Sequence, residues 1–176
     1  NRCRRQRQMC IRDRFSGGLA GTQTGAVTIS DTEGTITATT LTDITAQTNG
    51  TVTAAAAGIT ISGNTTQLTA ALVTEETKAV VANGAVSISD TGTIAATVLS
   101  GIGATTGGVV TAANALTITG TTEEITNALV TESSLVVASN GSSAVTFVGD
   151  NPTGAQLAAI NPKVGGTITL ADVTQV

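Results

Sequence analysis

The chain of 176 residues contains no histidine, tryptophan or tyrosine, and its two cysteines are Cys3 and Cys10. General acid–base and nucleophilic catalysis depend on groups that titrate near neutral pH, and histidine and cysteine are the usual ones. Beyond residue 10 the chain has neither, so it has no basis for a disulfide framework or a thiolate metal site. We therefore expect a protein that is not an enzyme and needs no cofactor.

Aromatic residues make up only 1% of the chain and charged residues 11%, whereas about a quarter of an ordinary domain is charged. The core must therefore consist of Val, Ile, Leu and Ala, which suit narrow stacked layers better than a thick globular interior. What the chain has in abundance is threonine, with 36 residues beside 20 glycines and 2 prolines. Threonine is β-branched and favours strands.

The charge is divided unevenly along the chain. Six of the eight cations are arginines within residues 1–14, and beyond them Lys78 and Lys163 oppose eleven carboxylates, which gives this part a net charge of −9. Such an acidic surface repels nucleic acid and anionic lipid. We therefore expect no nucleic-acid partner and no membrane insertion.

Residues 1–14 share nothing with the sequence that follows them. The string QMCIRDR at residues 8–14 closely resembles translated sequencing-adapter read-through at the ends of metagenomic reading frames. This resemblance implies that residues 1–14 are non-native or disordered and that the natural N-terminus is missing. Residues 15–24 are then expected to be a linker.

The rest of the chain is a tandem repeat. Copy 1 spans residues 25–83, copy 2 spans 84–143, and residues 144–176 form a partial third copy. Gly25 and Leu72 of copy 1 correspond to Gly84 and Leu129 of copy 2, with only short gaps between them. Each full copy divides into two units of roughly 29 residues, a length typical of solenoid repeats. Five units begin with similar strands, which are AVTIS, GITIS, AVSIS, LTIT and AVTFV.

Within each unit the pattern predicts a strand, a turn, a short helix-like run and a second strand. In the first unit Val27 and Ile29 alternate with Thr28 and Ser30, which is the period of a half-buried strand. We therefore predict a mainly β fold with short helices, a solenoid-like stack of strand–helix–strand repeats. The alternative is a set of small β-sandwich modules of about 58 residues.

Three stretches carry a family resemblance: VTISDTEGTITA, ITISGNTTQLTAALV and VTFVGDNPTGAQLAAINPKVGGTITLADV. They are similar to the Thr/Ala/Val/Gly-rich repeat arrays of adhesin-like surface proteins from cyanobacteria and other marine bacteria. The resemblance implies a non-enzymatic structural or adhesive segment of a large secreted or cell-surface bacterial protein. The implied partners are neighbouring repeats, further copies of the same protein, or an external surface or glycan.

The strands that begin the units also present hydroxyl groups on one side. If the units stack in register, these hydroxyls form files about 4.8 Å apart. Regular threonine arrays resemble ice-binding solenoids, so an ice- or crystalline-surface-binding protein is the alternative function. A solvated strand surface is the plainer interpretation. The candidate contact residues are Thr28, Ser30, Thr60, Ser62, Ser87, Ser89, Thr117, Thr119 and Thr146.

Carboxylates are the remaining candidates for chemistry. Calcium needs six to eight oxygen ligands, and no unit contains a dense acidic run, so capping or turn roles explain the acids at strand ends more simply. The paired glutamates are expected on solvated helix faces. The acids considered for calcium are Asp31, Glu33, Asp90, Asp150 and Asp172, and the pairs are Glu75–Glu76 and Glu123–Glu124.

Overall fold

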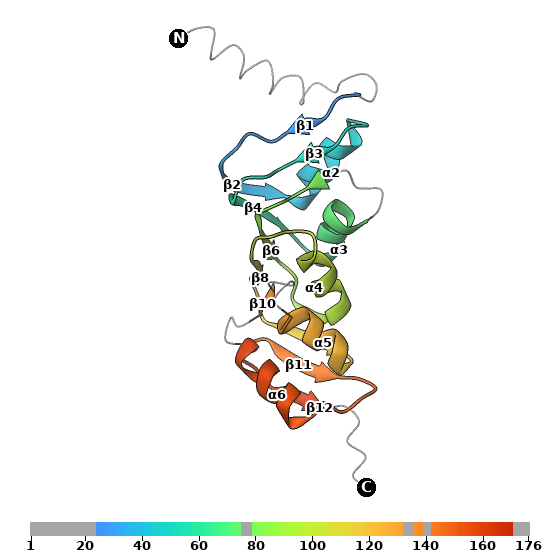
Figure 1. Cartoon of the computed structure of the whole chain (residues 1–176), viewed down its shortest axis with the longest axis vertical. Helices are drawn as coiled ribbons and strands as arrows, with labels where there is room; N and C mark the ends of the chain where they lie inside the picture. Colours follow the sequence, from blue (N-terminus) through green and yellow to red (C-terminus); the bar gives the residue numbers. More distant parts are fainter. Residues whose placement is uncertain (1–23, 75–78, 132–135, 139–141, 171–176) are drawn as a thin grey trace.

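The computed structural model describes residues 24–74, 79–131, 136–138 and 142–170. The molecule is elongated, and the described chain advances along its long axis from the first strand to the last (Figure 1). Two or three short strands followed by a helix form one layer, and successive layers lie next to one another along this axis.

Copy 1 comprises the first two layers and one further strand, which belongs to layer 3. Layer 1 consists of β1 (Val27–Thr28), β2 (Glu33–Thr37) and α2 (Ala38–Ala46). Layer 2 consists of β3 (Val52–Thr53), β4 (Gly58–Gly63), the short helix α3 (Thr65–Leu68) and the π-helical turn η1 (Thr69–Val73) that continues it.

The later layers repeat this plan with one addition. Layer 3 has three strands, β5 (Ala79–Val80), β6 (Ala85–Ile88) and β7 (Gly92–Ala95), before α4 (Ala96–Gly103). Layer 4 contains β8 (Val110–Ala112), β9 (Leu116–Gly120) and α5 (Thr122–Leu129). Layer 5 contains β10 (Val136–Val137), β11 (Ala144–Phe147), α6 (Gly154–Ile160) and η3 (Asn161–Lys163), and β12 (Ile168–Leu170) follows it.

The strands form three sheets, in the orders β1-β3-β5, β10-β8-β6-β4-β2 and β12-β11-β9-β7, and every described strand pair is parallel. Paired residues belong to successive layers, as in Val145 with Ile168 and Thr117 with Ala144. Parallel strands need a crossover connection, and here the helices provide it. The helices form one column in which α2 contacts η1, η1 contacts α4, α4 contacts α5 and α5 contacts α6.

The prediction of a mainly β fold is only partly right, because the structure mixes strands with short helices that hold about as many described residues. Most helices begin at a Thr or Asn cap that leads into a run of helix-forming residues, as at Asn64 and Thr121. The β-sandwich alternative is wrong, because sandwich modules are antiparallel and the described pairs are all parallel.

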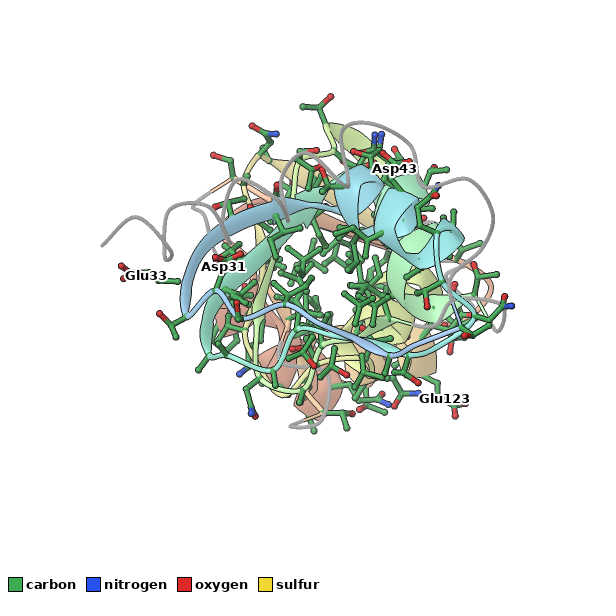
Figure 2. The ribbon with its side chains drawn as sticks, turned by 90° about the horizontal axis from the view of Figure 1, so that it is seen from above. Asp31, Glu33, Asp43 and Glu123 are labelled. Carbon is green, nitrogen blue, oxygen red and sulfur yellow. The ribbon has the colours of Figure 1, made fainter. Side chains whose placement is uncertain are left out.

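The core is a narrow column between the strands and the helices, and side chains from both point towards the long axis (Figure 2). Ile59, Ile61, Leu68 and Ile118 are 0% exposed, and Phe147 is the largest of the fully buried side chains. Burial of one such side chain contributes roughly 1.5–3 kcal/mol. As the composition indicates, small aliphatic residues fill almost the whole core.

The stacking of the layers differs from the direct stacking of half-copy units expected from the sequence. Strands β4 and β6 pair as expected, and so do β9 and β11, but β1 pairs with β3 instead of β4, and β6 pairs with β8 instead of β9. The physical reason is the extra strand in layer 3. Strand β6 begins copy 2, yet it continues the sheet of copy 1 by joining β4 on one edge to β8 on the other. Each copy therefore spans more than two layers, and β1, β6 and β11 lie in three different sheets.

Candidate functional site

The predicted hydroxyl ladder is divided among the three sheets. Thr28 lies in the sheet of β1, and Ser30 follows that strand; Thr60, Ser62 and Ser87 lie in the five-stranded sheet, with Ser89 just beyond β6. Thr117, Thr119 and Thr146 lie in the four-stranded sheet. The expectation of one continuous ladder is therefore wrong: β4 pairs with β6 and β9 pairs with β11, but β1 does not pair with β4 and β6 does not pair with β9. All nine side chains are exposed or half-buried.

The register creates different files of hydroxyl residues on the outer faces. In the five-stranded sheet Thr37 pairs with Ser62, Ser62 with Ser87 and Ser87 with Thr111. In the four-stranded sheet Thr119 pairs with Thr146 and Thr146 with Thr169. Sequence reasoning missed the threonines on other strands that pair with the predicted ladder residues, although the same period-two alternation could have found them. The missed residues are Thr35, Thr37, Thr53, Thr93, Thr111 and Thr169.

Apolar residues interrupt the outer files. Thr60 pairs with Ala85, Thr117 pairs with Ala144, and Thr111 pairs with Val137. In the described sheets two hydroxyl files run side by side only from β2 to β4, where Thr35 and Thr37 pair with Thr60 and Ser62. The hydroxyl of Thr37 also accepts a hydrogen bond from the N–H of Thr40 at 3.1 Å, as the cap of α2. The hydroxyl surface is thus a series of small patches.

Other threonine hydroxyls are buried and connect neighbouring layers. Thr48 is 1% exposed; its hydroxyl donates to the carbonyl of Gly25 and accepts from the N–H of Gly50 at 3.0 Å. Thr106 makes the same pair of bonds in copy 2, to the carbonyl of Gly84 and from the N–H of Gly108 at 3.0 Å. Because an unpaired buried backbone group is costly, these hydroxyls stabilise the contact between layers.

The glycines beside these threonines permit the close approach. A Cβ atom at Gly50 would collide with the carbonyl oxygen of Gly25, and one at Gly108 would collide with that of Gly84. Both separations would be under 3.0 Å, which is closer than a Cβ atom tolerates, so only glycine fits at either position.

Two of the strand-end aspartates also connect layers. The N–H of Thr65, the first residue of α3, donates to Asp90 Oδ2 at 2.6 Å, and the Thr65 hydroxyl donates to Asp90 Oδ1 at 3.0 Å. The N–H of Thr122, the first residue of α5, donates to Asp150 Oδ1 at 2.8 Å. A carboxylate is favourable at a helix N-terminus, where the helix dipole and free N–H groups attract negative charge. Each aspartate therefore stabilises the helix of the preceding layer.

Asp90 and Asp150 thus bind the N-terminus of a helix that precedes them in the chain, whereas the sequence suggested a cap for the helix that follows. Asp31 and Glu33 are exposed, and Figure 2 shows both at the left of the molecule, whereas Asp43 on α2 lies at the upper right. Among the described residues no three or more Asp, Glu, His or Cys side chains gather closely enough to hold a metal ion. Asp172 and the pair Glu75–Glu76 lie outside the described residues.

The second glutamate pair lies in the first turn of α5. The Glu124 carboxylate accepts from the N–H of Thr121 at 2.9 Å, and the Thr121 hydroxyl accepts from the N–H of Glu124 at 3.3 Å. This reciprocal pair is a capping box. Glu123 is exposed beside it (Figure 2), where its charge favours the helix N-terminus.

Searches with the sequence and the structure matched no protein-family model, no curated protein and no solved structure. Throughout the described ranges no helix has the length and apolar character needed to cross a bilayer. The function is therefore inferred from the geometry of the layers and their surfaces.

Proposed function

We propose that this chain is a non-enzymatic structural or adhesive segment of a large secreted or cell-surface protein, in which the layers continue as a solenoid-like stack. The regular step between paired strands, about 25 residues and thus typical of a solenoid repeat, supports this architecture. A repeat protein of this kind has contacts mainly between neighbours and can be extended by adding copies.

One observation carries the proposal: polar side chains that recur from one copy to the next serve contacts between layers. Thr48 and Thr106 each bond the carbonyl of the glycine that precedes a strand of the preceding layer. Asp90 and Asp150 each bond the first N–H of a helix in the preceding layer. Such groups maintain an extended shape. The outer surface that remains is acidic and rich in hydroxyls, which suits contact with neighbouring repeats, a glycan or another external surface.

Small-angle X-ray scattering on a chain with residues 25–83 present twice in succession tests the extended stack. A further copy spans a little more than two layers, so the maximum dimension should grow by roughly 10 Å, at about 4.8 Å per layer, while the cross-section stays constant. A chain that grows in cross-section instead would contradict the proposal. Turnover of any compound in a metabolite screen would contradict its non-enzymatic part.

The adhesive role needs a separate measurement. The labelled full chain should be retained on a panel of glycans or mineral particles, or should associate with itself as concentration rises. A chain that stays monomeric and binds no surface would leave only the spacing role.

The alternative function, binding to ice or another crystalline surface, is favoured by the aligned file Thr119–Thr146–Thr169 and by the four-residue patch of Thr35, Thr37, Thr60 and Ser62. Thermal hysteresis and ice-recrystallisation assays on residues 15–176 test it directly. Activity that is lost in Thr146→Leu and kept in Thr97→Leu, an exposed position on α4, would support ice binding. No effect at high protein concentration would eliminate it.

A further inference from the structure

The first strand of each copy has the same place in the repeat and a different set of neighbours. Strand β6 pairs with β4 on one edge and β8 on the other, and β11 pairs with β9 and β12. Within the described part of the chain β1 pairs with β3 alone. Strands β6 and β11 each pair with the strand that opens the second half of the preceding copy, which is β4 or β9, and β1 has no such partner among the described residues.

The inward side chains of the first strand segment are incompletely covered. Val27 and Ile29 are half-buried, whereas their counterparts Val86 and Ile88 are 1% and 0% exposed and Val145 is 0% exposed. The same apolar positions are thus part of the closed core in two copies and of an open face in the first. Exposed apolar surface of this kind favours association.

The acid that follows this strand shows the same difference. Asp90 and Asp150 each accept from the first N–H of a helix in the preceding layer, at Thr65 and Thr122. Asp31 has the equivalent place in copy 1, is exposed, and makes no hydrogen bond within the described residues. A carboxylate at the place of a helix N-terminus attracts one, because the helix end carries partial positive charge.

We propose that layer 1 is a docking surface for the second half of a further copy of this repeat, meaning a β4-type strand followed by an α3-type helix. This segment would pair with the edge of β1 that has no partner among the described residues, cover Val27 and Ile29, and place its first helical N–H on Asp31. The inference rests on the proposed stack and names the surface and the segment through which the stack continues.

The occupant is a copy carried in the same polypeptide. A second molecule has no suitable strand free among the described residues, because β4, β9 and β11 are each already paired on both edges. A copy joined directly ahead of Gly25 supplies the strand and the helix in the order and spacing found at both internal junctions.

The test compares Asp31→Asn in two settings: the unmodified full chain, and the full chain in which residues 25–83 occur twice in succession. Asp43→Asn on α2 is the matched control, since Asp43 is exposed and makes no side-chain hydrogen bond among the described residues. In the unmodified chain neither substitution should change the denaturation midpoint or amide exchange. In the duplicated chain, Asp31→Asn is made in the second copy, and the amide that responds is that of Thr65 in the first copy. Exchange of this amide should accelerate roughly tenfold, since a hydrogen bond to a charged group is lost.

The outcomes separate this inference from the proposed function. A duplicated chain that fails to fold, or one in which Asp31→Asn behaves like Asp43→Asn, would overturn the docking surface. The proposed stack fails in another way: Asp90→Asn in the unmodified chain would then leave exchange of the Thr65 amide unchanged.

Discussion

At the scale of single residues, threonine has two distinct roles in this molecule. On the outer faces it satisfies strand propensity while its hydroxyl meets solvent, as at Thr111 and Thr169. At Thr48 and Thr106 the same side chain is buried and bonds one carbonyl of the preceding layer and one N–H of its own turn. Composition alone predicts the first role. The second depends on long-range contacts that local sequence patterns do not show.

Replacing a bridging threonine should destabilise the stack. Thr106→Val keeps the shape of the side chain but leaves the carbonyl of Gly84 and the N–H of Gly108 without their partner. The free energy of unfolding should fall by about 1–3 kcal/mol, as measured by urea denaturation. Thr111→Val is the control, since this exposed strand residue should change stability by less than about 0.5 kcal/mol. Equal effects of the two substitutions would contradict the bridging role.

The close approach of glycine to backbone gives a second prediction at this scale. Gly108→Ala would place a Cβ atom within 3.0 Å of the carbonyl oxygen of Gly84, so the layers must separate locally and the thermal midpoint should fall by several degrees. Gly154→Ala meets open space at the start of α6 and should stabilise by about 0.4–1 kcal/mol. A midpoint for Gly108→Ala that matches the unmodified protein would show that this approach is not required.

At the scale of secondary structure elements, the described α-helices are short, and all except α6 begin within two residues of the end of a strand. The existence of both elements is predictable, because period-two strands are followed by polar caps and then by helix-forming residues. The extent of the helices is harder to predict, since short runs such as α2 and α6 are marginal alone and persist through packing in the column. For this reason the mainly β prediction underestimated them.

Removal of a cap should weaken one helix specifically. Thr121→Ala deletes the hydroxyl that accepts from the N–H of Glu124 at the start of α5, at a cost of about 1 kcal/mol. Amide exchange in residues 122–129 should accelerate about fivefold as a result, with α2 at the far end unchanged. Thr97→Ala on the exposed face of α4 is the control and should be neutral or slightly stabilising. Uniform acceleration across all layers would instead indicate global unfolding.

At the scale of the whole molecule, the sequence repeat and the structural layer are different periods. The copies begin at Gly25 and Gly84, whereas paired residues such as Val27 and Val52 are separated by less than half of that interval. The first strand of each copy therefore lies in a different sheet from the first strand of the copy before it. The repeat was visible in the sequence, but the register was not, because β6 opens copy 2 yet pairs with β4 of copy 1 on one edge and with the dissimilar strand β8 on the other.

The same shift of register explains which site predictions succeeded. The predicted hydroxyl ladder was divided because its strands belong to different sheets. Asp90 and Asp150 were interpreted as capping or turn residues, whereas each accepts from the first N–H of a helix in the preceding layer, whose N-cap is Asn64 or Thr121. Local sequence patterns identify a cap only for the helix that follows it, so contacts to an earlier helix are not predictable from them.

Paired cysteines test the layer register most directly. In a chain with Cys3 and Cys10 replaced by Ser, the pair Ser87→Cys and Thr111→Cys joins residues that face each other on β6 and β8, where the Cα separation of neighbouring strands permits a disulfide. The control pair, Ser87→Cys and Thr117→Cys, joins positions that would be neighbours if the half-copy units stacked directly. We expect rapid oxidation of the first pair and none of the second. Oxidation of the second pair alone would contradict the layered register.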